Sequence, residues 1–357
     1  STPSTGRFCF VRSRTSPSES QTKIGMSESP RRVLVTGGAG FIGSHVADAF
    51  IARGDDVWIV DDFSSGKPEN VNGDAHLLRA DIRDEAVTKL FHEVRFDVVC
   101  HHAAQIDVRI SVDDPRRDAG INVDGLLNLT ESARAVGTSR FVYVSSGGVV
   151  YGEPEQRPTP ESAPKLPLSP YGVTKLAGEQ YLHYYREIHG MEYVALRYGN
   201  VFGPRQDPHG EAGVVAIFCR RLLRGDQLLI FGDGEQTRDY VYVKDVVSAN
   251  LMAAGMATQP DAALGLDDVA FNVGTGQGTS VNRLAEVLEK AAGREPNRQH
   301  EDARPGELRH STLDNGKFGR AGWSPAHSLE EGLKETYDFI ADRMRAEAAS
   351  SAGDGAA

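Results

Sequence analysis

A glycine-rich segment between a predicted strand and a predicted helix constrains the fold of this chain more than any other feature. It reads Val-Leu-Val-Thr-Gly-Gly-Ala-Gly-Phe-Ile-Gly-Ser-His and spans residues 33–45. Gly37, Gly40 and Gly43 lack a Cβ atom, so the turn can tighten and the backbone can approach a diphosphate. The unpaired N–H groups that begin the helix also attract phosphate. The segment therefore predicts a dinucleotide-binding cradle.

Acidic residues follow the next predicted strands at the spacing that such a cradle requires. Asp61 and Asp62 end the second strand about 20 residues downstream of the glycines, where a carboxylate binds the ribose hydroxyls of adenosine. A carboxylate there repels a 2′-phosphate, which favours NAD over NADP. Asp81 and Ile82 follow a third strand, and their position alone leaves open whether they flank the adenine.

Short apolar, β-branched runs alternate with amphipathic helical patterns through the first half of the chain. We expect strands at residues 32–36, 56–60, 76–80, 97–101, 140–145 and 193–197, with helices at 44–53, 85–93, 120–136 and 171–189. Right-handed crossovers between parallel strands place helices on both faces of a sheet. The predicted fold class is therefore α/β, a Rossmann-type doubly wound parallel sheet.

The pattern changes after residue 199 and predicts a smaller C-terminal lobe that binds substrate. Residues 200–213 are rich in Gly, Pro and charge and are expected to form a functional loop. We divide the chain into a disordered extension (1–29), a Rossmann domain (30–199), a lobe whose chain returns to the sheet (200–345) and a flexible tail (346–357). Further helices are expected at 214–224, 244–256, 281–292 and 329–345.

Composition excludes several classes of protein. The formal net charge of −11 over 357 residues argues against nucleic acid as the main partner, because phosphate backbones select basic surfaces. Cys9, Cys100 and Cys219 are too few and too widely spaced for a disulfide framework or a metal cluster, which favours a reducing cytoplasm. The chain contains no metal-binding motif and no apolar run near the ~20 residues that span a bilayer.

Tyr171 and Lys175 form the candidate catalytic pair. A spacing of four places both side chains on one face of a helix. An ammonium close to the phenol favours its ionised form, which can take a proton from a substrate hydroxyl while hydride leaves the same carbon. Ser145 and Ser146, at the end of the preceding strand, are the candidate hydroxyl donors, although strand-end serines also cap backbone groups.

Taken together, these residues resemble the extended short-chain dehydrogenase/reductase family and, within it, the UDP-glucose (UDP-galactose) 4-epimerases. The resemblance covers residues 31–345. It rests on the segments at 36–45, 61–66, 81–82, 102–105, 122, 171–175, 196–200, 231–241 and 304–307.

The resemblance implies an NAD site, a UDP-sugar site and a homodimer formed by helices near residues 122–135 and 171–189. NAD is expected to contact Gly37, Gly40, Phe41, Ile42, Gly43, Asp61, Asp62, Phe63, Ser64, Ser65, Gly66, Asp81, Ile82, His102, Ala103, Ala104, Gln105, Ile106, Asn122, Tyr171 and Lys175. The substrate is expected to contact Ser146, Asn200, Leu229, Ile230, Phe231, Arg238, Arg304, Glu307 and Ser311. An ion pair with a neighbouring acid such as Asp239 is the alternative role for Arg238.

One departure from the family pattern affects the hydroxyl donor. Gly147 occupies the position where many members carry a third Ser or Thr, so the role passes to Ser146, Ser145 or water. Gly148 and Val149 replace the acidic residues of related dehydratases and decarboxylases, which leaves epimerisation as the expected reaction. Small Ser311 is expected to admit UDP-N-acetylhexosamines, unless that position is uninformative.

Two other activities fit parts of this pattern. A UDP-glucuronate 4-epimerase would need a cation for the C6 carboxylate, and the sequence does not locate one. A non-catalytic NAD-sensing regulator often loses the Tyr/Lys pair, whereas this chain keeps it.

Overall fold

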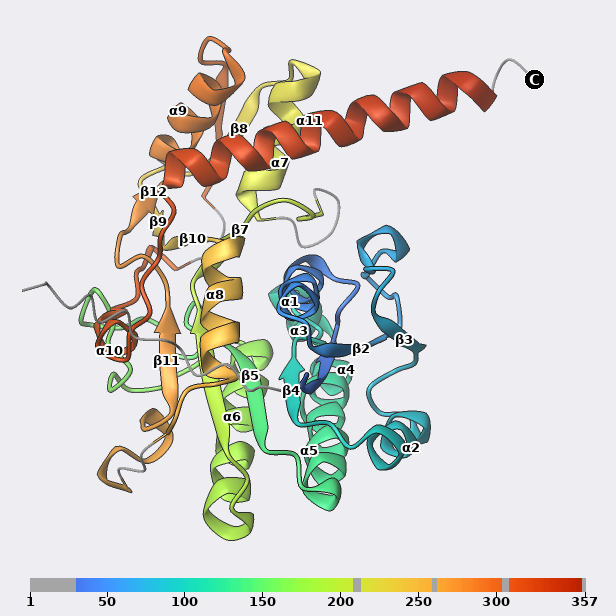
Figure 1. Ribbon diagram of the computed structural model, residues 1–357. Helices are drawn as coiled ribbons and strands as arrows, with labels where there is room; N and C mark the ends of the chain where they lie inside the picture. The colour runs from blue at the N-terminus through green and yellow to red at the C-terminus, as the bar shows by residue number, and fades with distance from the viewer. Residues whose placement is uncertain (1–29, 208–212, 259–261, 304–307, 355–357) are drawn as a thin grey trace, which may run out of the picture.

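A seven-stranded parallel sheet forms the centre of the larger domain (Figure 1). The computed structural model describes residues 30–207, 213–258, 262–303 and 308–354. The strand order is β11-β6-β5-β4-β1-β2-β3, so the order reverses between β1 and β4. The strands are β1 (Arg32–Thr36), β2 (Asp56–Asp61), β3 (His76–Arg79), β4 (Val98–His101), β5 (Arg140–Ser146), β6 (Tyr193–Tyr198) and β11 (Ala270–Val273). The predicted doubly wound fold is confirmed.

Helices cover both faces of this sheet because successive strand residues point to opposite sides. Val33 and Val35 of β1 pack in the core that includes α1 (Phe41–Ala52) and α8 (Val243–Ala253). Leu34 packs in the opposite core. The helices on that side are α2 (Glu85–Val94), α5 (Gly125–Val136) and α6 (Pro170–His189).

The smaller lobe has a third apolar core, formed mainly by α7 (Val214–Arg224), α9 (Val281–Ala292) and α11 (Leu329–Asp354). Figure 1 shows α11 crossing α7 and α9 and continuing beyond them. The lobe's strands are β7 (Asn200–Phe202), β8 (Leu228–Phe231), β9 (Thr237–Arg238), β10 (Tyr240–Tyr242), β12 (Thr279–Ser280), β13 (Arg298–Glu301) and β14 (His310–Ser311). The remaining elements are η1 (Pro68–Asn70), α3 (Val108–Asp113), α4 (Pro115–Ala119), the π-helical turn η2 (Gly120–Asp124), η3 (Ala262–Asp267) and α10 (Gly316–Arg320).

Several predicted boundaries were wrong, and three of the differences have a clear physical basis. The helix expected at 120–136 begins five residues earlier, because the Asp114 carboxylate caps α4 through the Arg117 N–H and Pro115 occupies the first helical position. The loop expected at 200–213 begins with β7, which pairs with β10. Helix α11 continues to Asp354 instead of ending at residue 345, in keeping with the high helix propensity of its alanines.

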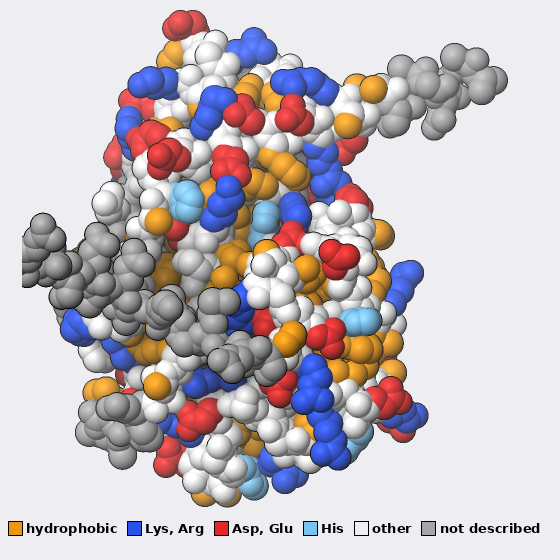
Figure 2. Space-filling model, viewed as in Figure 1, with side chains coloured by type: hydrophobic (Ala, Val, Ile, Leu, Met, Phe, Trp, Pro, Cys, Tyr) orange, Lys and Arg blue, Asp and Glu red, His pale blue; other side chains and the backbone are white. Residues whose placement is uncertain are grey.

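The described surface carries both signs of charge (Figure 2), and two of the cysteines lie in the interior. Acidic and basic side chains intersperse on the face that Figure 2 shows. Cys100 and Cys219 are buried, and Cys9 lies outside the described residues. Within the described ranges, no helix has the length and apolarity to cross a membrane. The same ranges contain no group of three or more His, Cys, Asp or Glu side chains that could bind a metal ion.

Candidate active site

The glycine-rich turn lies between β1 and α1, against the backbone that follows β4. Gly37 has a φ of +68°, and a Cβ atom there would lie 2.7 Å from the Ala103 nitrogen. A Cβ atom on Gly43 would collide with the Gly37 carbonyl oxygen. Helix α1 begins after Gly40 without a side-chain cap. The glycines therefore let the turn pack closely on neighbouring backbone, and the first N–H groups of α1, which no side chain caps, fit a dinucleotide diphosphate.

Asp61 ends β2 beside this turn. Its Oδ2 accepts a hydrogen bond from the Ala39 N–H at 2.9 Å, and its Oδ1 accepts one from the Phe63 N–H at 2.8 Å. Burial raises the pKa of this carboxyl, although both backbone hydrogen bonds oppose the shift. Asp62, by contrast, is exposed and accepts from the Ser64 N–H. Asp61 is therefore held by the cradle itself, where a ribose would contact it.

The other residues expected around the adenosine lie after β3. Asp81 forms an ion pair with Arg83, which lowers the pKa of the Asp81 carboxyl. Ile82 is buried against Gly125 of α5, where a Cβ atom would collide with its side chain. The structure thus gives both residues local protein partners, and their contact with adenine stays a prediction.

The loop after β4 borders the cradle and contains His102 through Gln105. The Asn122 amide secures it, because Nδ2 donates to the Gln105 carbonyl and Oδ1 accepts from the Gln105 N–H, both at 2.9 Å. The His102 Nε2 atom is buried and has no hydrogen-bond partner among the described residues. Burial, aided by the Lys175 charge, lowers the pKa of His102 to about 3, so the ring is neutral. An unpartnered nitrogen beside the cradle also fits a bound polar cofactor.

Tyr171 and Lys175 lie in the first turns of α6, as predicted. The helix begins at Pro170, and the Ser169 hydroxyl accepts from the Gly172 N–H. The Lys175 Nζ donates to the Val144 carbonyl at 2.9 Å and lies 5.8 Å from the centre of the Tyr171 ring. Burial lowers the pKa of Lys175 to about 8. A lysine and a tyrosine thus share a buried site at the carboxyl end of β5.

The two candidate serines point to opposite sides of β5, as neighbours in a strand must. The Ser145 hydroxyl donates to the Glu179 carboxylate at 2.5 Å and is buried, so it is engaged within the protein core. Ser146 is only half-buried. A Cβ atom on Gly147 would lie 2.6 Å from a Leu313 methyl carbon, which explains the glycine where a hydroxyl residue was expected.

The residues expected to bind the substrate belong to short strands of the smaller lobe. Ser311 of β14 lies opposite Arg238 of β9 in a parallel pair. Asn200 begins β7, and its N–H donates to the Asp239 carbonyl. The Asp239 carboxylate accepts from Thr275, Gly276 and Leu313, and the Arg238 guanidinium donates to the Thr237 carbonyl. The Asp239 carboxylate is therefore engaged by donors other than Arg238, and an ion pair of Arg238 with a neighbouring acid stays a prediction.

Strand β8 contributes three of the predicted substrate residues. Ile230 is completely buried in the core of the lobe, whereas Leu229 and Phe231 are half-buried. Successive side chains of a strand point to opposite faces, so Ile230 packs into the core while its neighbours face the other side. The structure gives no support for a contact between the Ile230 side chain and the substrate. Arg304 and Glu307 lie outside the described residues.

Three buried charged residues near the pair were missed from the sequence. Glu179 lies one turn after Lys175 and forms an ion pair with Arg197 of β6, with Nη2 to Oε2 at 2.5 Å. Asp118 of α4 accepts a hydrogen bond from the Thr174 hydroxyl at 2.8 Å. Two signals in the sequence could have found them: the spacing of 171, 175 and 179, and the Asp-Pro pair at 114–115.

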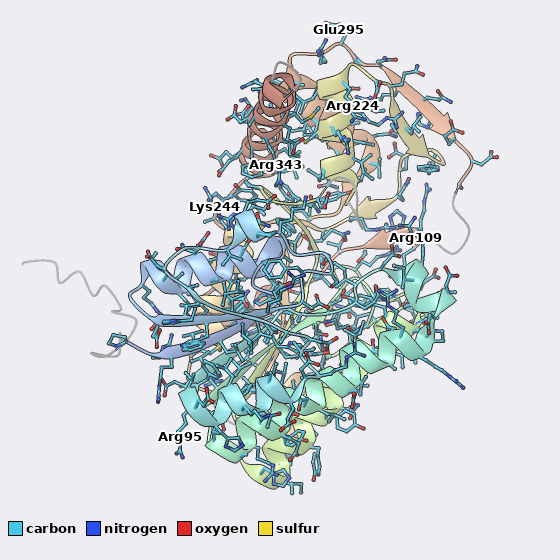
Figure 3. All side chains as sticks on the ribbon, turned by 90° about the vertical axis from the view of Figure 1, so that its right-hand side faces the viewer. Arg95, Arg109, Arg224, Lys244, Glu295 and Arg343 are labelled. Carbon is cyan, nitrogen blue, oxygen red and sulfur yellow. The ribbon has the colours of Figure 1, made fainter. Side chains whose placement is uncertain are left out.

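Figure 3 shows Arg109 on α3, next to α4, where the larger domain meets the smaller lobe.

Comparison with known proteins agrees with this geometry. A UDP-glucose 4-epimerase from Mycolicibacterium smegmatis is 45% identical over 320 residues, covering 88% of this chain and 100% of that protein. The crystal structure of a Thermotoga maritima UDP-glucose 4-epimerase with UDP-glucose has a TM-score of 0.83 at 46% identity, covering 88% of this chain and 99% of the other. The Thermus thermophilus UDP-glucose 4-epimerase in complex with NAD has a TM-score of 0.80 at 43% identity, covering 86% and 98%.

The sequence profile of the NAD dependent epimerase/dehydratase family matches residues 33–274, more than half of the chain. This range includes the cradle, Asp61 and the Tyr171/Lys175 pair, and it confirms both the resemblance and the predicted NAD cofactor. The chain belongs to the NAD-dependent epimerase/dehydratase family.

Proposed function

We propose that this protein is a UDP-hexose 4-epimerase that interconverts UDP-glucose and UDP-galactose through a 4-keto sugar. The observation that carries the proposal is the buried Tyr171/Lys175 pair beside the dinucleotide cradle, with Gly148 and Val149 where a second catalytic acid would stand. Relatives that match nearly their whole length are named UDP-glucose 4-epimerases, which supports the same conclusion.

NAD bound in the cradle would supply a reversible acceptor for the C4 hydride of the sugar. Tyr171 takes the proton from the C4 hydroxyl as that hydride leaves, and the C4–O bond becomes a carbonyl. Lys175 stabilises the phenolate by its charge. Tyr171 then returns the proton when hydride is delivered to the opposite face of C4. Each turnover therefore ends with the Tyr171 phenolate and the oxidised cofactor restored.

The sugar must turn over between the two hydride transfers while the nucleotide stays bound. Arg238 and Asn200 on the smaller lobe are proposed to hold the UDP part, because a guanidinium forms forked hydrogen bonds with a diphosphate. Binding energy remote from C4 then retains the keto sugar during its rotation. Arg304 and Glu307 are proposed to join this anchor on the grounds of the family pattern.

Ser146 is proposed as the hydroxyl that orients the C4 oxygen. Ser145 donates to Glu179 in the core, which leaves the half-buried Ser146 as the better candidate. Gly147 cannot be replaced by a larger residue without displacing Leu313. The hydroxyl expected at position 147 is therefore supplied by its neighbour.

We also propose a homodimer in which α6 packs against the same helix of a second copy. Val173, Tyr181, Tyr184 and Ile188 lie on one stripe of α6 and are exposed by 39% to 65%. Such a continuous apolar stripe on a surface helix is typical of an interface. Two-fold symmetry would cover it with the same stripe of the partner copy.

The test is incubation of the purified protein with a panel of UDP-sugars without added NAD. Wild type is expected to interconvert UDP-glucose and UDP-galactose, and Tyr171→Phe to lose at least about 10²-fold in kcat. The control Tyr337→Phe, packed against the core of the smaller lobe, is expected to match wild type. Near-normal turnover by Tyr171→Phe would overturn the assignment. If UDP-glucuronate were the only sugar converted, the protein would be a UDP-glucuronate 4-epimerase. If NAD were bound but no UDP-sugar were converted, the protein would be an NAD-sensing regulator.

A further inference from the structure

A fully buried carboxylate lies in the short helix just before the π-helical turn. Asp118 of α4 is 0% exposed, and its two oxygens accept three hydrogen bonds. The donors are the Gln105 side-chain amide at 2.8 Å, the Asn122 amide at 3.1 Å and the Thr174 hydroxyl at 2.8 Å. All three donors are neutral, so they satisfy the oxygens without neutralising the charge. A buried charge of this kind is costly unless another charge compensates for it.

These three donors belong to three different parts of the active site. Gln105 lies in the loop that borders the cofactor cradle, and Asn122 bridges that same loop from η2. Thr174 lies between Tyr171 and Lys175 on α6. The π-helical turn widens the helix locally, and such turns are frequent at functional sites. Asn122, in this turn, lies within hydrogen-bond distance of both Asp118 and Thr174. One carboxylate therefore joins the cofactor loop to the helix that carries the catalytic pair.

The charges around Lys175 leave Asp118 as its compensating group. His101 at the end of β4 and His102 in the loop that follows are near it, and burial and the Lys175 charge lower the pKa values of both rings, so both are neutral. Tyr143 faces it from β5, and burial raises the pKa of that phenol well above its usual value. On α6 itself, Glu179 is paired with Arg197. Among the described residues, the Asp118 charge opposes the effect of burial on the pKa of Lys175.

We propose that Asp118 is a positioning residue for the catalytic pair: its carboxylate, through the Thr174 hydroxyl and the Gln105 amide, fixes α6 against the cofactor loop and places a negative charge near Lys175. The proposal rests on the catalytic roles proposed above for Tyr171 and Lys175. Asp118 acts through these groups, because its carboxylate is fully buried and accepts its hydrogen bonds from Gln105, Asn122 and Thr174.

The experiment compares the pH dependence of kcat for wild type, Asp118→Asn and the matched control Asp113→Asn. Asp113 is an exposed carboxylate in the preceding helix, so its variant changes the net charge equally. Loss of a nearby negative charge makes both the ammonium and the phenol lose their protons more readily. In the plot of kcat against pH, the acid limb (Tyr171) and the alkaline limb (Lys175) of Asp118→Asn are therefore both expected to move to lower pH, by on the order of one pH unit. The profile of the control is expected to stay unchanged.

Thr174→Val separates the geometric part of the proposal from the charge. It removes one hydrogen bond to Asp118 but keeps the carboxylate, so kcat is expected to fall about tenfold, the typical effect of losing one positioning hydrogen bond, while the profile stays in place. This variant also tests the proposal if Asp118→Asn does not fold. An unshifted profile in a folded Asp118→Asn, or wild-type kcat in Thr174→Val, would overturn the proposal. Neither outcome would affect the assignment of Tyr171, which depends on the Tyr171→Phe experiment.

Discussion

The Lys175 ammonium donates a 2.9 Å hydrogen bond to the Val144 carbonyl from a position where the lysine is only 3% exposed. Burial lowers the pKa of this lysine from 10.5 to about 8. The charge therefore destabilises the folded state at neutral pH, and the residue is retained for its chemistry.

Lys175→Met is expected to lower kcat by at least about 10²-fold and to raise Tm at pH 7 by a few degrees. The sign follows from the lowered pKa: the penalty for burying the charge is complete below about pH 8 and disappears as the pH rises toward 10.5. The difference in Tm between variant and wild type should therefore shrink over that range. Thermal unfolding at several pH values measures it, and a Tm difference independent of pH would contradict the argument.

Gly37→Ala is expected to weaken NAD binding by more than about tenfold, because an L-residue at a φ of +68° is strained by ~1–2 kcal/mol. The added Cβ would also lie 2.7 Å from the Ala103 nitrogen and push apart two walls of the cradle. Calorimetric titration with NAD measures the change. Gly73→Ala is the control, since a Cβ atom there meets nothing within 4 Å. Equal affinities of the two variants would show that the turn does not form the cradle.

Ser311→Tyr is expected to lower turnover of UDP-N-acetylglucosamine by about tenfold or more while turnover of UDP-glucose changes less. Ser311 is buried and lies opposite Arg238, the proposed diphosphate anchor, so a bulky side chain there would narrow the sugar pocket. Ser311→Ala keeps the residue small and should behave like wild type. If wild type and Ser311→Tyr were equally active on the acetylated sugar, the size of residue 311 would not determine specificity.

The larger domain could be predicted from the sequence because its signals are local. Buried parallel strands appear as continuous apolar runs, and the glycines, Asp61 and the Tyr171/Lys175 spacing are each fixed by the chemistry that they perform. The same runs gave the six predicted strands within one residue of their observed ends. Only the seventh strand, β11, enters the sheet after a long excursion through the smaller lobe.

The parts that were missed depend on contacts between segments distant in sequence. Strands β9, β12 and β14 have two residues each, too few for any periodicity, and pairing with one another defines them. Helix propensity does not predict the π-helical turn. Its residue Asn122 is hydrogen-bonded to Gln105, a partner that only the folded chain brings close. The network around Asp118 joins residues 105, 118, 122 and 174, so it exists only once α4, α6 and the loop after β4 are packed together.

Ile188→Glu is expected to convert a dimer into a monomer. Ile188 is 65% exposed at the end of the apolar stripe on α6, and two-fold symmetry would bury two unpaired carboxylates in the interface, one from each copy. Sedimentation velocity at micromolar concentration measures the change in mass. Ile217→Glu on α7 is the matched control, because Ile217 is also an exposed isoleucine but lies in the smaller lobe. A dimer that persists in Ile188→Glu and dissociates in Ile217→Glu would place the interface on the smaller lobe instead of on α6.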